Sequence, residues 1–116
     1  MIVNSKITIY HKELDELLRL EKWKRYNYDK VWLFANEGAN VNQGYNNSDR
    51  VSVRIWYKLN ENLDIKNISK GDIIVEGHLT QDIETQQDLS NYEIYNVTSI
   101  TNNTYGNSRH IHLGGQ

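Results

Sequence analysis

The fold class is decided by one run of alternating residues, Val51-Ser52-Val53-Arg54-Ile55-Trp56-Tyr57-Lys58. In an extended chain successive side chains point to opposite sides, so the apolar residues at the odd-numbered positions share one face. The even-numbered positions, which include Arg54 and Trp56, share the other face. This pattern predicts a β-strand with one buried face and one exposed face.

Further runs rich in β-branched and aromatic residues lie on both sides of this strand. They cover residues 6–10, 30–35, 73–78 and 92–101. Within the third of these runs, Ile73, Ile74 and Val75 are consecutive, so we expect both faces of that strand to be covered. The chain has no proline, so clusters of Gly, Asn, Asp and Ser must supply the turns between the runs.

Residues 12–20 form the one helix candidate. Leu14, Leu17 and Leu18 fall at the i, i+3, i+4 spacing that places them on one side of a helix. A helix of about two turns is marginal in water, so we expect it to dock its leucines on the sheet. The alternative is an irregular hairpin arm that leads into residues 23–28.

These elements predict a single mainly β domain, residues 1–116, built as a small β-barrel or a rolled antiparallel sheet with long polar loops and room for one short helix. The Asn-rich loop at residues 40–49 and the C-terminal stretch 102–116 contain few core-forming residues. Segments of this composition are usually flexible in isolation. We therefore expect residues 102–116 to be a flexible tail.

The composition argues against several classes of function. Lysine and arginine number 13 against 15 aspartates and glutamates, and a formal net charge of −2 gives no positive field for nonspecific binding to nucleic acid or membrane. The absence of cysteine excludes disulfides and thiolate metal sites. The N-terminal residues turn polar before an apolar core forms, and no apolar stretch is long enough to span a bilayer. We therefore expect no signal peptide, and synthesis in the cytoplasm.

The strongest chemical signal is the pair His110 and His112. On a strand they share a face and could chelate a metal ion, but no third ligand stands nearby in the sequence, and a solvated tail explains the pair equally well. Acid–base catalysis needs carboxylates on a rigid scaffold, and the available ones lie in turn or outward positions typical of solvated faces. They are Asp64, Asp72, Glu76, Asp82, Glu84 and Asp88. Without a Gly-x-Ser-x-Gly motif or a phosphate loop, we expect no enzyme activity, no metal and no cofactor.

The exposed face of the strand at residues 51–58 is the candidate interaction site. It carries Arg54, Trp56 and Lys58, and tryptophan and arginine are enriched at the hot spots of protein interfaces. Aromatic and basic residues interleaved on a sheet are also typical of oligonucleotide-binding barrels, but the acidic balance elsewhere disfavours that function. We expect a surface that binds other proteins.

The strand sequences, taken in order, resemble a known family. Their succession is similar to that of the small head–tail connector proteins of tailed bacteriophages of Gram-positive hosts, in particular the head-closure or stopper group, often called minor capsid proteins. Residues 12–20 depart from it, because they are more leucine-rich than the usual first hairpin. The matching segments are Ile7-Thr8-Ile9-Tyr10, Val31-Trp32, Val51-Ser52-Val53-Arg54-Ile55, Gly71-Asp72-Ile73-Ile74-Val75-Glu76-Gly77, Tyr92-Glu93-Ile94-Tyr95-Asn96-Val97-Thr98-Ser99-Ile100 and Gly106-Asn107-Ser108-Arg109-His110-Ile111-His112-Leu113-Gly114-Gly115.

The resemblance implies a structural virion protein that forms a homo-oligomeric ring at the head–tail junction, helps to close the DNA channel and docks the tail. Its partners would be the adaptor, the portal ring and the tail-completion protein, with passive contact to packaged DNA. A rival interpretation is a small phage-encoded protein that binds and inhibits a host protein, and another is a metal-dependent enzyme built around the two histidines. In the connector interpretation, polar loop residues would face the channel: Asn42, Gln43, Tyr45, Asn46 and Asn47.

Overall fold

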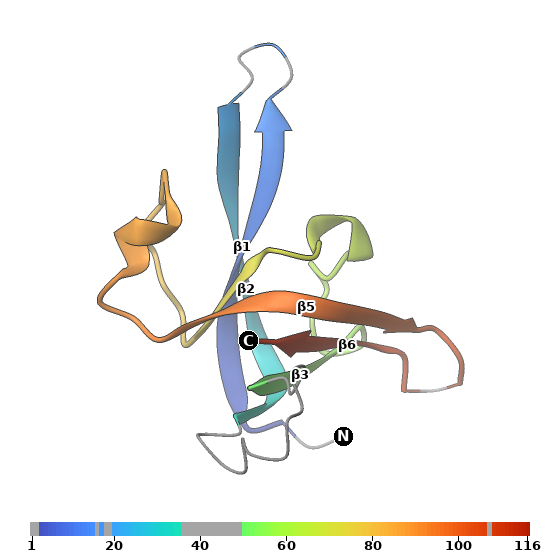
Figure 1. Ribbon diagram of the computed structural model, residues 1–116. Helices are drawn as coiled ribbons and strands as arrows, with labels where there is room; N and C mark the ends of the chain where they lie inside the picture. Colours follow the sequence, from blue (N-terminus) through green and yellow to red (C-terminus); the bar gives the residue numbers. More distant parts are fainter. Residues whose placement is uncertain (1–2, 16, 18–19, 36–49, 107) are drawn as a thin grey trace, which may run out of the picture.

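The chain forms a closed barrel of six antiparallel strands in the order β1-β2-β3-β6-β5-β4, and β4 pairs back onto β1 (Figure 1). This confirms the prediction of a mainly β fold with a small barrel. The computed structural model describes residues 3–15, 17, 20–35, 50–106 and 108–116.

The strands differ greatly in length, because β1 and β2 extend well beyond the barrel. Two short 3-10 turns lie in the connections that precede β4 and β5. In the described ranges, no helix is long and apolar enough to cross a bilayer. The elements are β1 (Ser5–Asp15), β2 (Leu20–Ala35), β3 (Val51–Trp56), η1 (Ile65–Asn67), β4 (Ile73–Glu76), η2 (Gln86–Leu89), β5 (Ile94–Asn103) and β6 (His110–Gly115).

The barrel interior is filled by alternate residues of each strand. Val51, Val53 and Ile55 of β3 are at most 1% exposed, as the alternation in the sequence predicts. Burial of each such aliphatic side chain contributes about 1.5–3 kcal/mol relative to exposure. The interior cluster comprises Ile7, Ile9, Tyr28, Val31, Val51, Val53, Ile55, Leu63, Ile68, Ile74, Tyr95, Val97, Ile111 and Leu113.

Strand β4 is covered on both faces, which confirms the expectation from its continuous apolar sequence. Ile74 points into the barrel, and the residues before and after it pack outside the barrel against Ile83 and Leu89. These two residues belong to the segment between β4 and β5, residues 77–93, which folds over the outer surface of β4. We call this segment the β4–β5 connection.

The described residues of the predicted helix, 12–15, 17 and 20, belong to a hairpin arm, so the prediction of a docked helix is wrong and the alternative is correct. Beyond Tyr10, β1 pairs with β2 alone, and the two strands leave the barrel as the projection at the top of Figure 1. Leu14 is 66% exposed and Leu17 is 95% exposed. An isolated helix of two turns is marginally stable in water, whereas a long antiparallel ladder pairs the backbone N–H and C=O groups of the two strands. The segment therefore forms the ladder despite the helical spacing of its leucines.

The C-terminal residues form a barrel strand, so the prediction of a flexible tail over residues 102–116 is wrong. Strand β6 lies between β3 and β5 and is hydrogen-bonded to both. Its alternation directs Ile111 and Leu113 inward, where both are fully buried. A Cβ atom on Gly115 would lie 2.9 Å from Val51 Cγ1, so the close approach of these strands requires glycine at that position.

Candidate interaction surface

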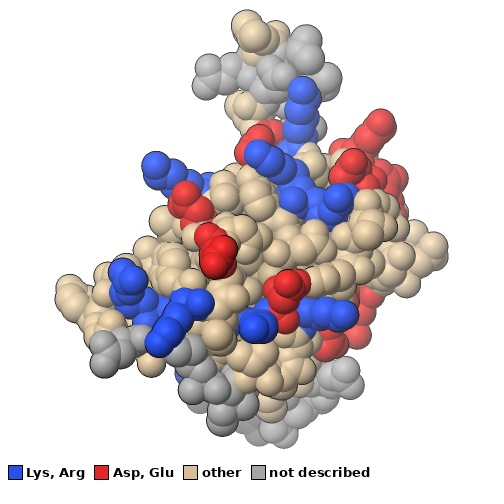
Figure 2. Space-filling model, turned by 180° about the vertical axis from the view of Figure 1, so that it is seen from behind, with Lys and Arg blue, Asp and Glu red and all other residues tan. Residues whose placement is uncertain are grey.

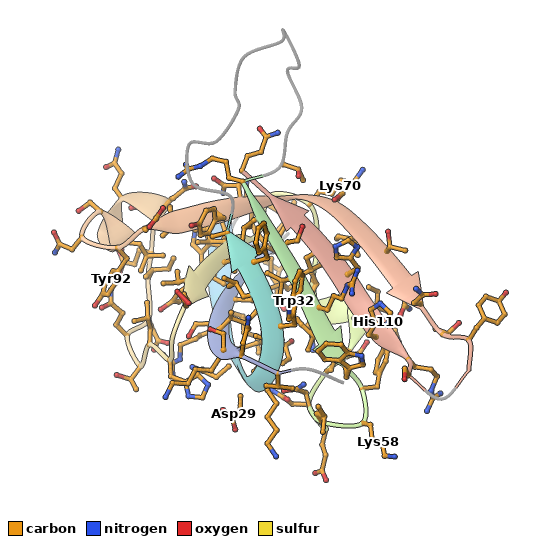
Figure 3. The ribbon with its side chains drawn as sticks, turned by 90° about the horizontal axis from the view of Figure 1, so that it is seen from below. Asp29, Trp32, Lys58, Lys70, Tyr92 and His110 are labelled. Atoms are coloured by element: carbon orange, nitrogen blue, oxygen red, sulfur yellow. The ribbon has the colours of Figure 1, made fainter. Side chains whose placement is uncertain are left out.

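Three side chains form a stacked row on the outer surface of the barrel. Trp32 and Phe34 are two residues apart on β2 and so point to the same side, with ring centroids 6.1 Å apart and ring planes 8° apart. Arg54 on β3 is the register partner of Trp32, and its guanidinium carbon lies 5.1 Å from the indole centroid. Figure 3 looks onto this side of the barrel, with Trp32 labelled. We call these three residues the aromatic face.

The aromatic face is exposed at Phe34 and Arg54, and its three side chains are stacked on one another. Phe34 is 56% exposed and Arg54 is also exposed. The guanidinium of Arg54 has no hydrogen bond or ion pair to another described residue, so its donors point to solvent. Stacking of a cation on an exposed aromatic ring contributes about 0.5–1 kcal/mol and holds the guanidinium in one orientation. An apolar ring and a planar cation therefore stand side by side, as in many interface hot spots.

Of the three predicted interface residues, one, Arg54, belongs to the aromatic face. Arg54 is exposed as predicted, but Trp56 is 7% exposed, so the prediction that it is an accessible anchor is wrong. Strand β3 ends at Trp56, and Lys58 is exposed in the turn that follows and not on the strand. Sequence reasoning missed Trp32 and Phe34, although their alternation along β2 was the available signal.

His110 and His112 lie on the outer side of β6, as their i, i+2 spacing predicts, in register with Trp56 and Arg54. His110 Nδ1 lies 2.9 Å from the Ser108 carbonyl oxygen, and its ring centroid is 6.0 Å from that of Trp56. In the part of the chain that the structure describes, no three His, Asp or Glu side chains are grouped so that they could hold a metal ion. Outside the described residues lie the loop positions predicted to face a channel: Asn42, Gln43, Tyr45, Asn46 and Asn47.

A buried histidine–carboxylate pair, His11 and Asp72, lies where the arm leaves the barrel. Asp72 is fully buried, which corrects the expectation that it is a solvated carboxylate. Its Oδ2 lies 2.8 Å from His11 Nδ1 and accepts a 2.7 Å hydrogen bond from the Ser69 backbone N–H, and its Oδ1 accepts a 3.1 Å hydrogen bond from the Lys12 backbone N–H. Both carboxylate oxygens therefore have hydrogen-bond partners, as a buried carboxylate requires. Because two of these partners belong to β1 and the third to the turn before β4, Asp72 links β1 to that turn.

A hollow lies between the arm and the β4–β5 connection. This groove has a volume of about 870 Å³, with Trp23 and Ile83 among its apolar lining residues. Arg25 bridges the groove at one point, because it donates a hydrogen bond of 2.6 Å to Asp82 Oδ1 and one of 2.7 Å to the Thr80 carbonyl oxygen. Lys22, Lys24 and Glu13 line the arm side, and Asp82, Glu84 and Thr85 line the side of the connection.

The β4–β5 connection carries a fixed negative charge. The backbone N–H groups of Glu84 and Thr85 donate hydrogen bonds of 2.9 and 3.2 Å to Asp88 Oδ2. These two hydrogen bonds lower the pKa of the Asp88 carboxyl, that from Glu84 more than that from Thr85. Asp88 is therefore ionised at neutral pH and holds the turn at the start of η2.

A protein-family model matches almost the whole chain. No curated protein and no solved structure matches the sequence. The family model that matches spans residues 2–116. The chain therefore belongs to the family of unknown function DUF6751.

Proposed function

We propose that this protein is a structural subunit of the head–tail junction of a tailed bacteriophage, of the head-closure type. It is made in the cytoplasm of the bacterial host and assembles in the virion as a ring that meets the adaptor and portal on one side and the tail on the other. The resemblance of the strand sequences suggests this function, and the described surfaces support a role in protein assembly.

The observation that carries the proposal is the projecting arm. A two-stranded hairpin is marginally stable by itself, and among the described residues no other strand pairs with the outer edge of β1 beyond Tyr10 or with that of β2 before Val31. Two of its leucines, Leu14 and Leu17, are 66% and 95% exposed. Exposed apolar side chains and an open strand edge are features that a partner protein would cover.

The charge distribution also suits a component that surrounds DNA without binding it tightly. Figure 2 shows lysine and arginine side chains interspersed with aspartate and glutamate over the face seen from behind. The whole chain has nearly equal numbers of the two kinds, 13 against 15. A surface of mixed sign releases few counterions on contact with DNA, so packaged DNA would pass without adhering.

The test is deletion of this gene from the phage that encodes it, followed by electron microscopy of the lysate. We expect separate tails beside heads that have lost their DNA, and whole infectious particles after purified protein is added. Normal infectious particles from the deletion strain would refute the proposal and favour a protein that binds a host target.

A matched pair of variants links the arm to this function. Addition of the Leu17→Ser protein should restore fewer joined particles than the wild type, because Leu17 is 95% exposed and would contribute to a partner contact. Tyr105→Ser is the control, because Tyr105 is also a large exposed residue, at 88%, but lies between β5 and β6. Equal restoration by the two variants would remove the arm from the proposal.

A further inference from the structure

The outer wall of the barrel that carries the aromatic face has charge of one sign. In the closed strand order β2, β3, β6 and β5 are neighbours, and Figure 3 looks onto this side of the barrel. The parts of the sequence that form this wall contain no aspartate or glutamate, although the whole chain contains 15. The net charge of −2 therefore does not describe this wall, and an anion that approaches it meets positive charge. We call these segments, residues 30–35, 51–58 and 94–116, the basic wall; its exposed cations are Lys30, Arg54, Lys58 and Arg109.

A row of outward side chains crosses the basic wall in register. Trp32 on β2 is the register partner of Arg54 on β3. Arg54 in turn is the partner of His112 on β6, which is the partner of Thr101 on β5. Register partners on neighbouring strands point to the same side of a sheet about 5 Å apart, so the row is about 15 Å long. An aromatic ring, a guanidinium, an imidazole and a hydroxyl therefore follow one another along a line on which a short extended polymer fits.

Phe34 provides the exposed ring at the aromatic end of this row. It is 56% exposed, and its ring plane lies 8° from that of Trp32, with the two ring centroids 6.1 Å apart. The contact with Trp32 orients the phenyl ring, while much of its surface stays open. Every nucleobase has a flat π-face that can stack on such a ring, and loss of one stacking ring weakens binding about tenfold.

Arg54 provides a phosphate contact beside this ring. Its guanidinium carbon lies 5.1 Å from the Trp32 indole centroid, and its donors point to solvent. The planar fork of guanidinium N–H groups matches the oxygens of a phosphate. At the end of β3, Lys58 and Arg109 are neighbours, because the Tyr57 N–H donates a 3.1 Å hydrogen bond to the Arg109 carbonyl oxygen. A stacking ring and several cations therefore share one wall.

We propose that the basic wall binds single-stranded nucleic acid, with a base stacked on Phe34 and an adjacent phosphate held by Arg54. A duplex keeps the faces of its bases inside its own stack, so only unpaired bases can use the ring. Double-stranded DNA packaged in a head would not engage Phe34, and the mixed charges in Figure 2 belong to another face of the molecule than the one in Figure 3. The proposed binding therefore goes beyond the head–tail function and does not depend on it.

Fluorescence anisotropy of labelled oligonucleotides tests the proposal on the full chain. The probes are oligothymidylate and oligouridylate of about 12 nucleotides, within the site sizes of small nucleic-acid-binding barrels, and a DNA duplex of the same length. We expect the tighter of the two single strands to bind with a Kd on the order of 10 µM at low salt, and the duplex to bind about tenfold more weakly. The tighter single strand identifies DNA or RNA as the ligand. A duplex that binds as tightly as that strand, or no binding of either single strand below about 1 mM, would overturn the proposal.

Polyglutamate of the same length separates stacking from charge. It carries a similar density of negative charge but no flat rings. It should therefore displace the bound oligonucleotide only at a concentration about tenfold higher than unlabelled oligonucleotide does. Equal displacement would overturn the proposal and favour an acidic protein as the partner of this wall.

Substitutions of Phe34 test the stack itself. Phe34→Leu keeps an apolar side chain but removes the ring, so it should weaken binding about tenfold, whereas Phe34→Tyr keeps the ring and should bind within about twofold of the wild type. Tyr92→Leu is the matched control, because Tyr92 is also exposed, at 41%, but lies in the β4–β5 connection. Its affinity should equal that of the wild type. Equal binding by the two Phe34 variants, or an equal loss in the Tyr92 variant, would overturn the stack.

Arg54→Gln tests the phosphate contact independently of the ring. The logarithm of the affinity for a single strand falls linearly with the logarithm of the salt concentration, with a slope of about −0.7 for each phosphate neutralised. The variant should therefore make this slope shallower by about 0.7, and an unchanged slope would contradict the contact. If the single strand binds but the gene deletion leaves normal virions, nucleic-acid binding stands and the head–tail function fails; the converse pair of results has the opposite meaning.

Discussion

Replacement of Asp72 by asparagine should destabilise the barrel by about 1–3 kcal/mol, the cost of leaving a buried hydrogen-bond donor without an acceptor. The carboxylate accepts from the Lys12 N–H on Oδ1 and from the Ser69 N–H on Oδ2. An asparagine side chain has one oxygen and one NH₂ group. In either orientation of the amide, one of these backbone N–H groups faces another donor inside a residue that is fully buried.

The change is measured by urea unfolding followed by fluorescence of the three tryptophans. A loss of 1–3 kcal/mol corresponds to a decrease in melting temperature of roughly 4–12 °C for a domain of this size. Asp82→Asn is the matched control, because Asp82 also pairs with a cation, at 2.6 Å, but its side chain is 87% exposed. An exposed pair of this kind contributes less than about 1 kcal/mol. Equal losses in the two variants would refute the argument that burial makes Asp72 important.

Three further predictions test the barrel interior and the corrected surface. Tyr28→Phe should cost little stability at neutral pH and should make the protein less sensitive to unfolding at alkaline pH. Burial raises the pKa of Tyr28, so the stability that its neutral form contributes is complete below pH 10 and is lost as the pH rises above 10, by up to about 1.4 kcal/mol per pH unit. An unchanged dependence of the unfolding free energy on alkaline pH would contradict this. Gly115→Ala should destabilise by about 1–3 kcal/mol through the contact with Val51, and unfolding at the wild-type urea concentration would contradict the close approach. Trp56→Ala should lose about 3–5 kcal/mol and Phe34→Ala about 0.5 kcal/mol or less in the same assay, and the reverse order would contradict their assigned burial.

The local alternation of residues predicts the parts of the fold that depend on one strand. Val51, Val53 and Ile55 are interior as predicted, because a period of two assigns each side chain to one side of a sheet. The same period is present at Ile111 and Leu113, but the glycines that follow lower the strand propensity. The reason for glycine becomes clear only from the packing of β6 against β3, where a Cβ atom on Gly115 would be too close to Val51.

The errors concern contacts between segments that are distant in sequence. Alternation places Trp56 on the outer side of β3, but it does not reveal that other parts of the chain cover that position. The pair His11 and Asp72 is separated by 61 residues and forms only because β1 pairs with β4. Leu14 has the helical spacing to the leucines that follow it, yet the ladder with β2, in which it is the register partner of Glu21, decides its conformation.

The most direct test of the central claim is the position of the protein in the particle. Purified virions of the phage that encodes it are labelled with a gold-conjugated antibody against this chain and viewed by electron microscopy. The proposal predicts gold at the neck between head and tail in particles opened enough to admit the antibody, and the band of this chain in protein gels of washed virions. Absence of the chain from washed virions would contradict it.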